Sequence, residues 1–309
     1  MLTIYKSTER GLETVPDIAD GCWVHVITPG PEEISRLESL GVPPDFLTHA
    51  PDLDERPRTE RDDGGLLIVL HFPYAQGPSA DIPFITVPLS IILTEKLIVT
   101  IAPLATGVMQ KFAAGNVRGL STAKKTRFVL HLLWHIANQY LVQLREINAA
   151  VDAVEDRLQR SLRNREVMEL LKYQKSLVYF TTALKSNELV LGRLQRGHLL
   201  QLYPEDDELL DDVLIEVRQA IEMTSISEDI LSQMMDAFAS IISNNLNVVL
   251  KFLASVTIIL SVPTLIASLY GMNVDLPLDE HPLAFALILA VSVAISLIVV
   301  VVFWRKDWL

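Results

Sequence analysis

The clearest pattern in the chain is a pair of long apolar runs near its C-terminal end. Residues 252–269 and residues 283–303 contain no charged side chain. As helices, each run is long enough to cross roughly 30 Å of hydrocarbon. Two buried core helices of a soluble domain are the alternative, but two such runs rarely follow one another at the end of a globular domain. The pattern therefore predicts two transmembrane helices.

The charges around these runs predict an orientation. Lys251 precedes the first run, and Arg305 and Lys306 follow the second. The connecting stretch has no Lys or Arg but carries the acidic residues Asp275, Asp279 and Glu280. Because positive residues collect on the cytoplasmic side, we expect a multi-pass protein of the plasma membrane with both termini in the cytoplasm.

The N-terminal part reads as a mixture of strands and short helices. A proline at its start and Gly41 at its end predict a helix over Pro31–Leu40. β-branched and leucine-rich residues predict a strand over 66–72 and a hairpin of 91–93 with 97–101. Residues 52–61 are charged and broken by proline, so we expect a loop there.

The middle of the chain has helical periodicity. Ile147, Val151, Val154 and Leu158 recur at spacings of three and four, which is typical of an amphipathic helix. Asn164 is a plausible turn before a second helix, which would end at Arg196-Gly197. No proline or glycine interrupts residues 206–262, so one helix of about 60 residues could run from the acidic segment through the membrane, roughly 90 Å.

These patterns predict a fold class and three parts. The fold class is a cytoplasmic N-terminal α/β domain followed by long α-helices and two C-terminal transmembrane helices. The expected boundaries are 1–125 for the α/β domain, 126–247 for the cytoplasmic helices with the long stalk helix, and 248–309 for the transmembrane domain. Within the last part we expect the first span at about 250–270, the outer loop at 271–282 and the second span at about 283–304.

Composition narrows the function classes. The net charge of −12 argues against nucleic acid as a partner, because nucleic acid needs a basic surface. Cys22 is the only cysteine, which excludes an intrachain disulfide and a cysteine-rich metal site. No glycine-rich phosphate loop and no set of nucleophile, base and orienting residue is evident, so we do not expect an enzyme.

Two clusters could hold a metal, and each has a simpler explanation. His131 and His135 lie one helical turn apart, but a half-buried helix face is the better explanation of this pair. Six carboxylates between residues 205 and 212 either complement the positive end of a helix dipole or bind a cytosolic divalent cation through oxygen ligands.

The sequence Tyr270-Gly271-Met272-Asn273 closes the first span. Glycine there can end a helix in the left-handed conformation, which would leave carbonyl oxygens and the Asn273 amide at the outer mouth. This Gly-Met-Asn motif between two C-terminal spans resembles the signature of the CorA magnesium transporter family. Asp54-Glu55-Arg56-Pro57-Arg58 and the ending Arg305-Lys306-Asp307-Trp308-Leu309 also look like that family, and the resemblance covers nearly the whole chain.

The resemblance implies an assembly and a function. It implies a funnel-shaped homopentamer in the lipid bilayer, in which the first span lines a pore and the long helix forms the funnel wall. Such channels pass Mg²⁺, and often Co²⁺ or Ni²⁺, down the electrochemical gradient. They close when cytosolic Mg²⁺ occupies sites between subunits, so Mg²⁺ would be both cargo and regulator.

The resemblance also implies roles for individual residues. Asn273 matches the selectivity-ring asparagine, and Gly271 provides the neighbouring carbonyl, within the motif that also holds Tyr270 and Met272. Gap-free counting places six residues on the pore-facing side of the helix: Thr264, Ser261, Leu253, Leu250, Asn247 and Asp236. Ser261 stands where some members carry a methionine gate, which is a departure from the family pattern. Asp212 falls on a regulatory aspartate, with Asp81 as a possible partner, and Asp275, Asp279 and Glu280 form an approximate outer acidic ring.

Two other functions stay open. A zinc or other transition-metal transporter of the ZntB branch would carry the same motif and would suit His281 in the loop. The pore-facing stripe has no His or Cys, however, and those are the ligands that Zn²⁺ prefers. A membrane-anchored structural or regulatory protein is the third possibility. Polar Asn247, Thr264 and Asn273 on one face of an apolar helix argue against it.

Overall fold

A computed structural model of the chain describes residues 1–9, 11–50, 52–62, 64–115, 117, 119–160, 164–272, 283–306 and 308. By their internal packing these residues form two compact units, Met1–Gln233 and Met234–Leu309. Each unit is described by itself below. The boundaries expected from the sequence at residues 125 and 247 stay predictions.

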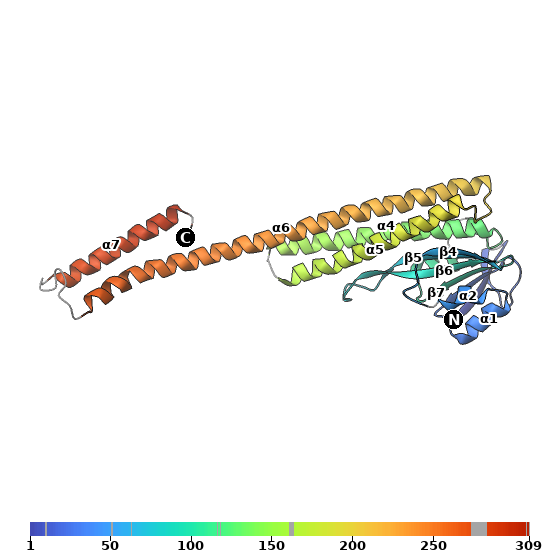
Figure 1. Cartoon of the computed structure of the whole chain (residues 1–309), viewed down its shortest axis with the longest axis horizontal. Coiled ribbons are helices and arrows are strands. Elements are labelled where there is room, and N and C mark those ends of the chain that lie inside the picture. Colours follow the sequence, from blue (N-terminus) through green and yellow to red (C-terminus); the bar gives the residue numbers. More distant parts are fainter. Residues whose placement is uncertain are drawn as a thin grey trace. The chain divides into compact units, whose positions relative to one another are not determined.

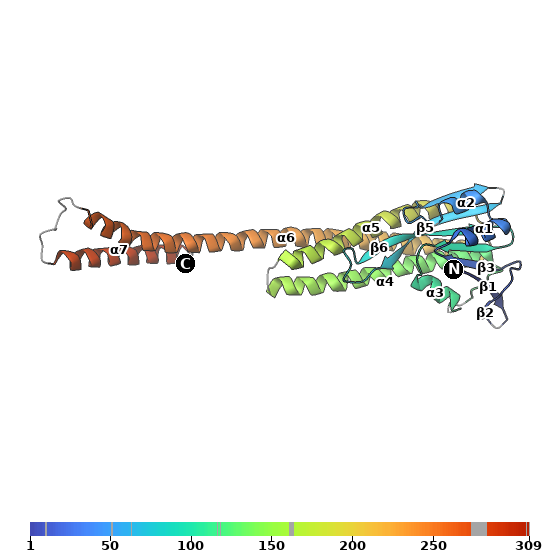
Figure 2. The ribbon, with the colours of Figure 1, turned by 90° about the horizontal axis from the view of Figure 1, so that it is seen from below.

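The first unit is built on a seven-stranded sheet (Figures 1 and 2). The strands are β1 (Leu2–Thr8), β2 (Gly11–Thr14), β3 (Trp23–Ile27), β4 (Arg58–Asp62), β5 (Gly65–Ala75), β6 (Phe84–Leu93) and β7 (Ile98–Ala102). Their order across the sheet is β2-β1-β3-β7-β6-β5-β4. Only the β3–β7 pair is parallel among these strands, and the others are antiparallel.

Alternating side chains give the sheet two apolar faces. Val24 and Val26 of β3 belong to one core cluster together with residues of α1 (Pro31–Ser39) and α2 (Pro44–Thr48). Trp23 points to the other face, where its ring packs against Phe112 of α3 (Gly107–Ala113) and Phe128 of α4 (Lys125–Arg160). The period of two residues in a strand explains why neighbours on β3 enter different cores. Figure 1 shows α1 and α2 on one side of the sheet and α4 and α5 (Asn164–Arg196) on the other.

Three polar side chains are buried together on the face of the sheet that α3 and α4 cover. The Trp23 indole Nε1–H donates to the Thr100 hydroxyl oxygen at 2.8 Å, and the hydroxyl lies 2.9 Å from Nδ1 of His25. His25 is only 5% exposed, and burial lowers its pKa from 6.5 to about 4. The imidazole is therefore neutral in the folded protein at neutral pH.

The buried His25 predicts a loss of stability in acid. Between pH 6.5 and about 4 the unfolded chain binds the proton and the folded chain does not, so the free energy of unfolding falls as the pH is lowered through this window. The full effect is about 3 kcal/mol. We expect His25→Gln to make thermal unfolding less sensitive to pH between 6.5 and 4.5. Replacing the exposed His49 in the same way should leave the sensitivity unchanged, and equal sensitivity in all three proteins would contradict this assignment.

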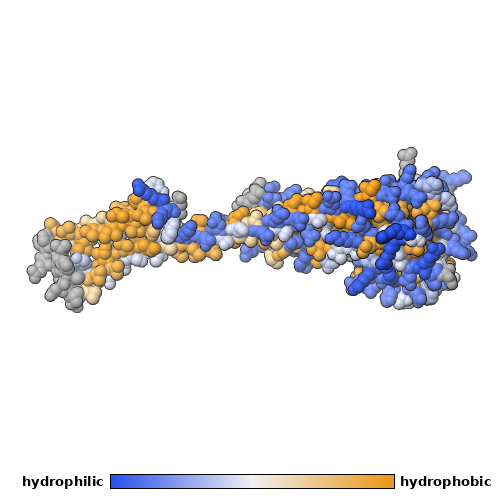
Figure 3. All heavy atoms as spheres, turned by 45° about the horizontal axis from the view of Figure 1, so that its top comes forward, coloured by the Kyte–Doolittle hydropathy of each residue, from blue (hydrophilic) through white to orange (hydrophobic). Residues whose placement is uncertain are grey.

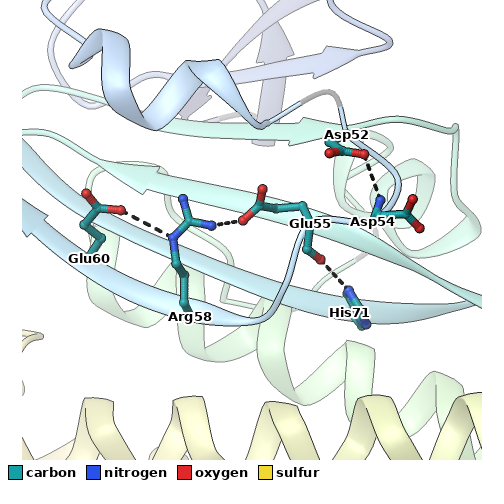
Figure 4. Close-up of polar contacts among 6 residues, drawn as sticks. All are labelled: Asp52, Asp54, Glu55, Arg58, Glu60 and His71. Carbon is teal, nitrogen blue, oxygen red and sulfur yellow. Dashed lines mark hydrogen bonds and ion pairs between the residues drawn. The ribbon is translucent and has the colours of Figure 1, made fainter.

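The motif Asp54-Glu55-Arg56-Pro57-Arg58 fixes the start of β4 against β5 (Figure 4). The Glu55 carboxylate is nearly buried and forms an ion pair with Arg58. The Glu55 carbonyl accepts a hydrogen bond from Nε2 of His71 at 2.8 Å, and burial lowers the pKa of that histidine. The loop expected over residues 52–61 is therefore wrong at its end, because residues 58–61 pair with β5. Antiparallel pairing with an apolar neighbour makes a strand of a segment whose own side chains are polar.

Helices α4 and α5 hold the sheet through polar contacts as well as apolar ones. Asn187 is 3% exposed, and its side-chain amide forms hydrogen bonds with the β5 backbone at His71. Its Oδ1 accepts from the His71 N–H at 2.9 Å, and its Nδ2 donates to the His71 carbonyl at 2.7 Å. The Tyr140 hydroxyl donates to the same carbonyl at 3.1 Å. These contacts at His71 fix the position of α4 and α5 along the sheet.

Helix α6 (Pro204–Tyr270) is continuous for 67 residues, which confirms the predicted single long helix. Pro204 at its first position and the acidic Glu205, Asp206 and Asp207 in its first turn are typical of a helix start. The predicted second helix and its end at Arg196 are confirmed by α5, but Asn164 is the first residue of this helix rather than a turn before it. The hairpin of β6 with β7 and the helix before Gly41 are confirmed too. The structure adds β1, β2 and β3, which no specific pattern in the sequence predicts.

The second unit contains the end of α6 and α7 (Ala284–Arg305). Both helices are long and apolar enough to cross a membrane. In each, only 6% of the most apolar 18-residue stretch is buried within the chain. A core helix of a soluble domain would be mostly buried. Figure 3 shows this part of α6 and α7 covered by hydrophobic side chains. The fold class expected from the sequence is confirmed for one chain.

Candidate functional site

The residues predicted to face a pore form one exposed stripe along the part of α6 that belongs to the second unit. Leu250 is 52% exposed and Leu253 is 59% exposed. The other predicted members are exposed as well: Asp236, Asn247, Ser261 and Thr264. Their successive spacings of eleven, three, three, eight and three keep them on a single helical face. The structure therefore brings these six residues together as a surface of one chain.

The C-terminal part of this stripe lines a shallow, open groove of about 680 Å³. Thr257, Ser261, Thr264 and Ser268 line it together with the apolar residues Ile258, Leu260, Val262 and Leu265. The helical spacing of the sequence already places Thr257 and Ser268 on the same stripe, although they are not among the six residues assigned to the pore.

The hydroxyl groups in the groove have a fixed orientation. Thr257 donates to the Leu253 carbonyl at 2.8 Å, Ser261 to the Thr257 carbonyl at 2.7 Å and Thr264 to the Leu260 carbonyl at 2.9 Å. Each hydroxyl proton is thereby used within the helix, and the oxygen keeps lone pairs for a further donor. Water that surrounds a cation turns its protons outward and can donate to such oxygens. The groove can therefore contact a hydrated cation without replacing its water.

The Tyr270-Gly271-Met272 segment ends α6 in a way that differs from the expected left-handed cap. Gly271 is absent from the residues with positive φ among those described, and its N–H still bonds the Ala267 carbonyl at 3.0 Å. A Cβ at Gly271 would lie 3.3 Å from the same Ala267 oxygen. Close approach to the last helical turn, rather than a left-handed backbone, is what favours glycine here. Met272 is 55% exposed.

Asn273, the predicted selectivity-ring residue, lies outside the described part of the chain. The same is true of the predicted outer acidic residues Asp275, Asp279 and Glu280, and of His281. Beside the described end of the motif, an apolar crevice of about 360 Å³ separates α6 from α7. It is lined by Pro263, Ile266, Ala267, Tyr270, Gly271, Phe285, Ile288, Leu289 and Ser292.

The two predicted regulatory aspartates lie far apart within one chain. Asp81 is exposed and pairs with Lys175 of α5 at 3.5 Å. Asp212 is exposed on α6, next to Asp211, which accepts a hydrogen bond from Gln195 of α5 at 3.0 Å. Lys175 and Gln195 are twenty residues apart on one helix, a rise of about 30 Å. The structure does not bring Asp81 and Asp212 together in a protomer.

The other candidate metal positions have structural roles. Nδ1 of His135 lies 2.8 Å from the His131 carbonyl, and its ring packs edge-on against Phe112. Asp206 is 2% exposed and pairs with Arg127, as does Glu205, so two of the six clustered carboxylates are already committed to ion pairs. No group of three or more His, Cys, Asp or Glu residues that could hold a metal occurs within the described ranges.

Comparison with known proteins places this geometry in a family. Residues 19–306 match the family model described as CorA-like Mg²⁺ transporter protein. The cobalt/magnesium transport protein CorA of Methanocaldococcus jannaschii is 33% identical over 300 residues, which is 93% of this chain and 91% of that protein.

Solved structures agree. The complete structure of the CorA magnesium transporter from the same organism matches with a TM-score of 0.87 and 27% identity, over 100% of this chain and 99% of that one. The ZntB cytoplasmic domain from Vibrio parahaemolyticus matches with a TM-score of 0.63 over 78% of this chain and 98% of that domain, and at 11% identity it shares the fold alone. With two C-terminal membrane helices, a polar stripe on the first of them and a match over nearly its whole length, this chain belongs to the CorA-like Mg²⁺ transporter family.

Proposed function

We propose that this protein conducts Mg²⁺, and also Co²⁺, passively across the membrane as a channel built from several copies of the chain. The observation that carries the proposal is the 33% identity, over 93% of the chain, to the cobalt/magnesium transport protein of M. jannaschii. The exposed stripe of α6 supports it. Asn247 and the groove hydroxyls offer neutral oxygen acceptors, which suit a small hard cation that gives up its water reluctantly.

The chemistry of the stripe favours Mg²⁺ over Zn²⁺. The described part of the stripe contains no His or Cys, the ligands that Zn²⁺ prefers. The likeness to the ZntB domain is one of fold and says nothing about which ion this chain transports. Zinc transport therefore stays the second candidate, and a non-transporting membrane protein the third.

Uptake into liposomes tests the proposed function. Purified protein would be reconstituted with a Mg²⁺-sensitive dye inside, and uptake of Mg²⁺, Co²⁺, Ni²⁺ and Zn²⁺ would be compared at equal concentration. We expect uptake of Mg²⁺ and Co²⁺ that is driven by the gradient alone. Zn²⁺ uptake without Mg²⁺ uptake would favour the second candidate, and no uptake of any of the four ions would contradict the channel.

The assembly follows from the geometry of the pore. One α6 and one α7 cannot enclose a water-filled path, so copies must surround a common axis with their α6 stripes facing inward. From the family resemblance we propose five copies, with both termini in the cytoplasm as Lys251, Arg305 and Lys306 indicate. The mass of the particle in lipid nanodiscs measures the number of copies, and a monomer or dimer there would contradict the ring.

We propose Asp212 as a ligand of regulatory Mg²⁺ between neighbouring subunits. Carboxylates repeated around a ring repel one another, and bound Mg²⁺ removes this repulsion and stabilises the closed state. Asp81 is the partner suggested by the resemblance. Rotation about an axis along the helices preserves height, so the difference of about 30 Å between the two residues weighs against that pairing.

We expect Asp212→Ala to make the channel close less completely when Mg²⁺ is raised on the cytoplasmic side. The reason is that one carboxylate ligand is lost from every subunit interface. Currents at a series of cytoplasmic Mg²⁺ concentrations measure the effect, with the exposed Asp229 on the same helix replaced by alanine as the control. A wild-type Mg²⁺ dependence in Asp212→Ala would remove Asp212 from the regulatory site and leave the channel itself unaffected.

A further inference from the structure

The first turns of α4 and α6 enclose a cavity of about 580 Å³ in the first unit. We call it the α4–α6 cavity. Its polar lining comes from Lys124, Lys125 and Arg127 on one side and from Tyr203, Glu205 and Asp206 on the other. Its volume lies within the range of about 300–1,000 Å³ that is usual for small-molecule sites. The ion pathway uses none of these six residues.

Two lysines give the cavity positive charge without a matching anion. Lys125 Nζ donates to two neutral groups, the Thr94 carbonyl at 2.8 Å and the Glu95 carbonyl at 2.5 Å. Lys124 is exposed and makes no ion pair within the described part of the chain. The N–H groups in the first turn of α4 add partial positive charge, because they lack partners within the helix. With Arg127 and the carboxylates Glu205 and Asp206, the lining carries three basic and two acidic side chains, a small positive excess in a chain whose net charge is −12.

Arg127 is held by two carboxylates, one nearly buried and one exposed. Its Nε lies 2.9 Å from Oδ1 of Asp206, and its Nη2 lies 2.6 Å from Oε2 of Glu205. Asp206 is nearly buried, and its second oxygen accepts from the Tyr203 N–H at 3.3 Å, so this carboxylate is fixed. The Glu205 side chain is 78% exposed. An anion with oxygens of its own can therefore take the place of Glu205 on Arg127, while Asp206 keeps the guanidinium in position.

The rim of the cavity adds an aromatic surface. Tyr203 is 62% exposed although it is a large aromatic residue, and it lines the cavity directly before the start of α6. An exposed tyrosine ring can stack on a planar base. A cavity of this volume is much larger than orthophosphate needs. The basic side and the ring together fit an anion that carries both phosphate and a flat ring system.

We propose that the α4–α6 cavity binds a phosphate-bearing anion, and that this anion is a nucleotide. The phosphates lie against Lys124, the first turn of α4 and Arg127, and the base stacks on Tyr203. The bound ligand links the start of α4 to the start of α6, so it acts on the cytoplasmic end of the helix that also carries the pore stripe. The site does not depend on the proposed cargo of the channel.

Binding to the full-length protein in lipid nanodiscs tests the proposal. Isothermal titration without Mg²⁺ would use ATP in one arm and inorganic phosphate in the other. We expect ATP to bind more tightly than phosphate. Lys124→Ala should weaken ATP binding by about tenfold, since a charge-assisted hydrogen bond is lost. Tyr203→Ala should weaken ATP binding by a similar factor of about ten and leave phosphate binding unchanged.

Glu205→Gln gives the sharpest test, because it should tighten the binding of both anions by removing the competing carboxylate. Lys185→Ala on the exposed side of α5 and Glu208→Gln, outside the cavity, are the matched controls and should bind as the wild type does.

Equal affinity for ATP and phosphate, with Lys124→Ala still weakening both, would reduce the site to a phosphate site and overturn the nucleotide. No binding of either anion, or wild-type affinity in Lys124→Ala and Glu205→Gln, would overturn the site altogether. Ion uptake by the same preparation reports on the channel separately.

Discussion

Replacing Asn273 with glycine is expected to abolish Mg²⁺ uptake while the oligomer stays intact. Helix α6 ends at Tyr270, three residues before Asn273 in the sequence, and we propose that the Asn273 amides surround the outer mouth of the pore. A ring of carboxylates at the mouth would bind Mg²⁺ and hold it, whereas a channel needs binding that is weak enough for release. Neutral amide oxygens can accept hydrogen bonds from the water around Mg²⁺ without displacing it. Glycine supplies no such oxygen.

The substitution separates selection of the ion from a role in ending the helix. If Asn273 only ended the helix, glycine would do so at least as well, and flux would be normal. Mg²⁺ uptake into liposomes would be measured for Asn273→Gly with particle mass determined in parallel, and for Asn273→Asp, which should change the ion preference or trap the ion. Uptake at the wild-type rate by Asn273→Gly would refute the selective role.

Replacing Asn187 with leucine is expected to give a large loss of stability. The Asn187 side chain is buried, with 3% of its surface exposed. Its amide makes two hydrogen bonds to the backbone of His71, at 2.9 and 2.7 Å. Leucine would leave the His71 N–H buried without a partner, while Tyr140 still donates to the carbonyl. The cost of one orphaned donor and one lost bond is about 3 kcal/mol. For a unit of this size that corresponds to a fall in Tm of about 6–12 °C.

Thermal unfolding of the full-length protein in detergent measures this effect. Ser186→Ala is the matched control, because Ser186 is the neighbouring residue on α5 and its hydroxyl bonds only to the Thr182 carbonyl of its own helix. We expect its Tm to stay close to that of the wild type. A fall of less than about 2 °C in Asn187→Leu would mean that the β5 backbone finds another partner for its N–H.

The sequence by itself determined the helical part of this protein and its membrane region. The two spans could be recognised because runs such as residues 283–303 are apolar on every side, a pattern that only lipid or a large core can accommodate. The length of α6 followed from the absence of helix breakers between residues 206 and 262. The stripe from Asp236 to Thr264 followed from the helical period. These features depend on neighbours within a turn or two, so local sequence is sufficient to determine them.

The tertiary structure alone decided which distant segments meet. The parallel pairing of β3 with β7, and the strand β4 made of polar residues, depend on partners far away in the chain. The same holds for Asn187 on His71 and for Lys175 beside Asp81, which places Asp81 away from Asp212. A polar side chain in the sequence does not reveal its partner, because a hydrogen bond or ion pair forms only once folding has brought the two groups within about 3 Å. The α4–α6 cavity is of this kind, since its two sides come from residues 123–127 and 201–206 and only the packing of two helices joins them.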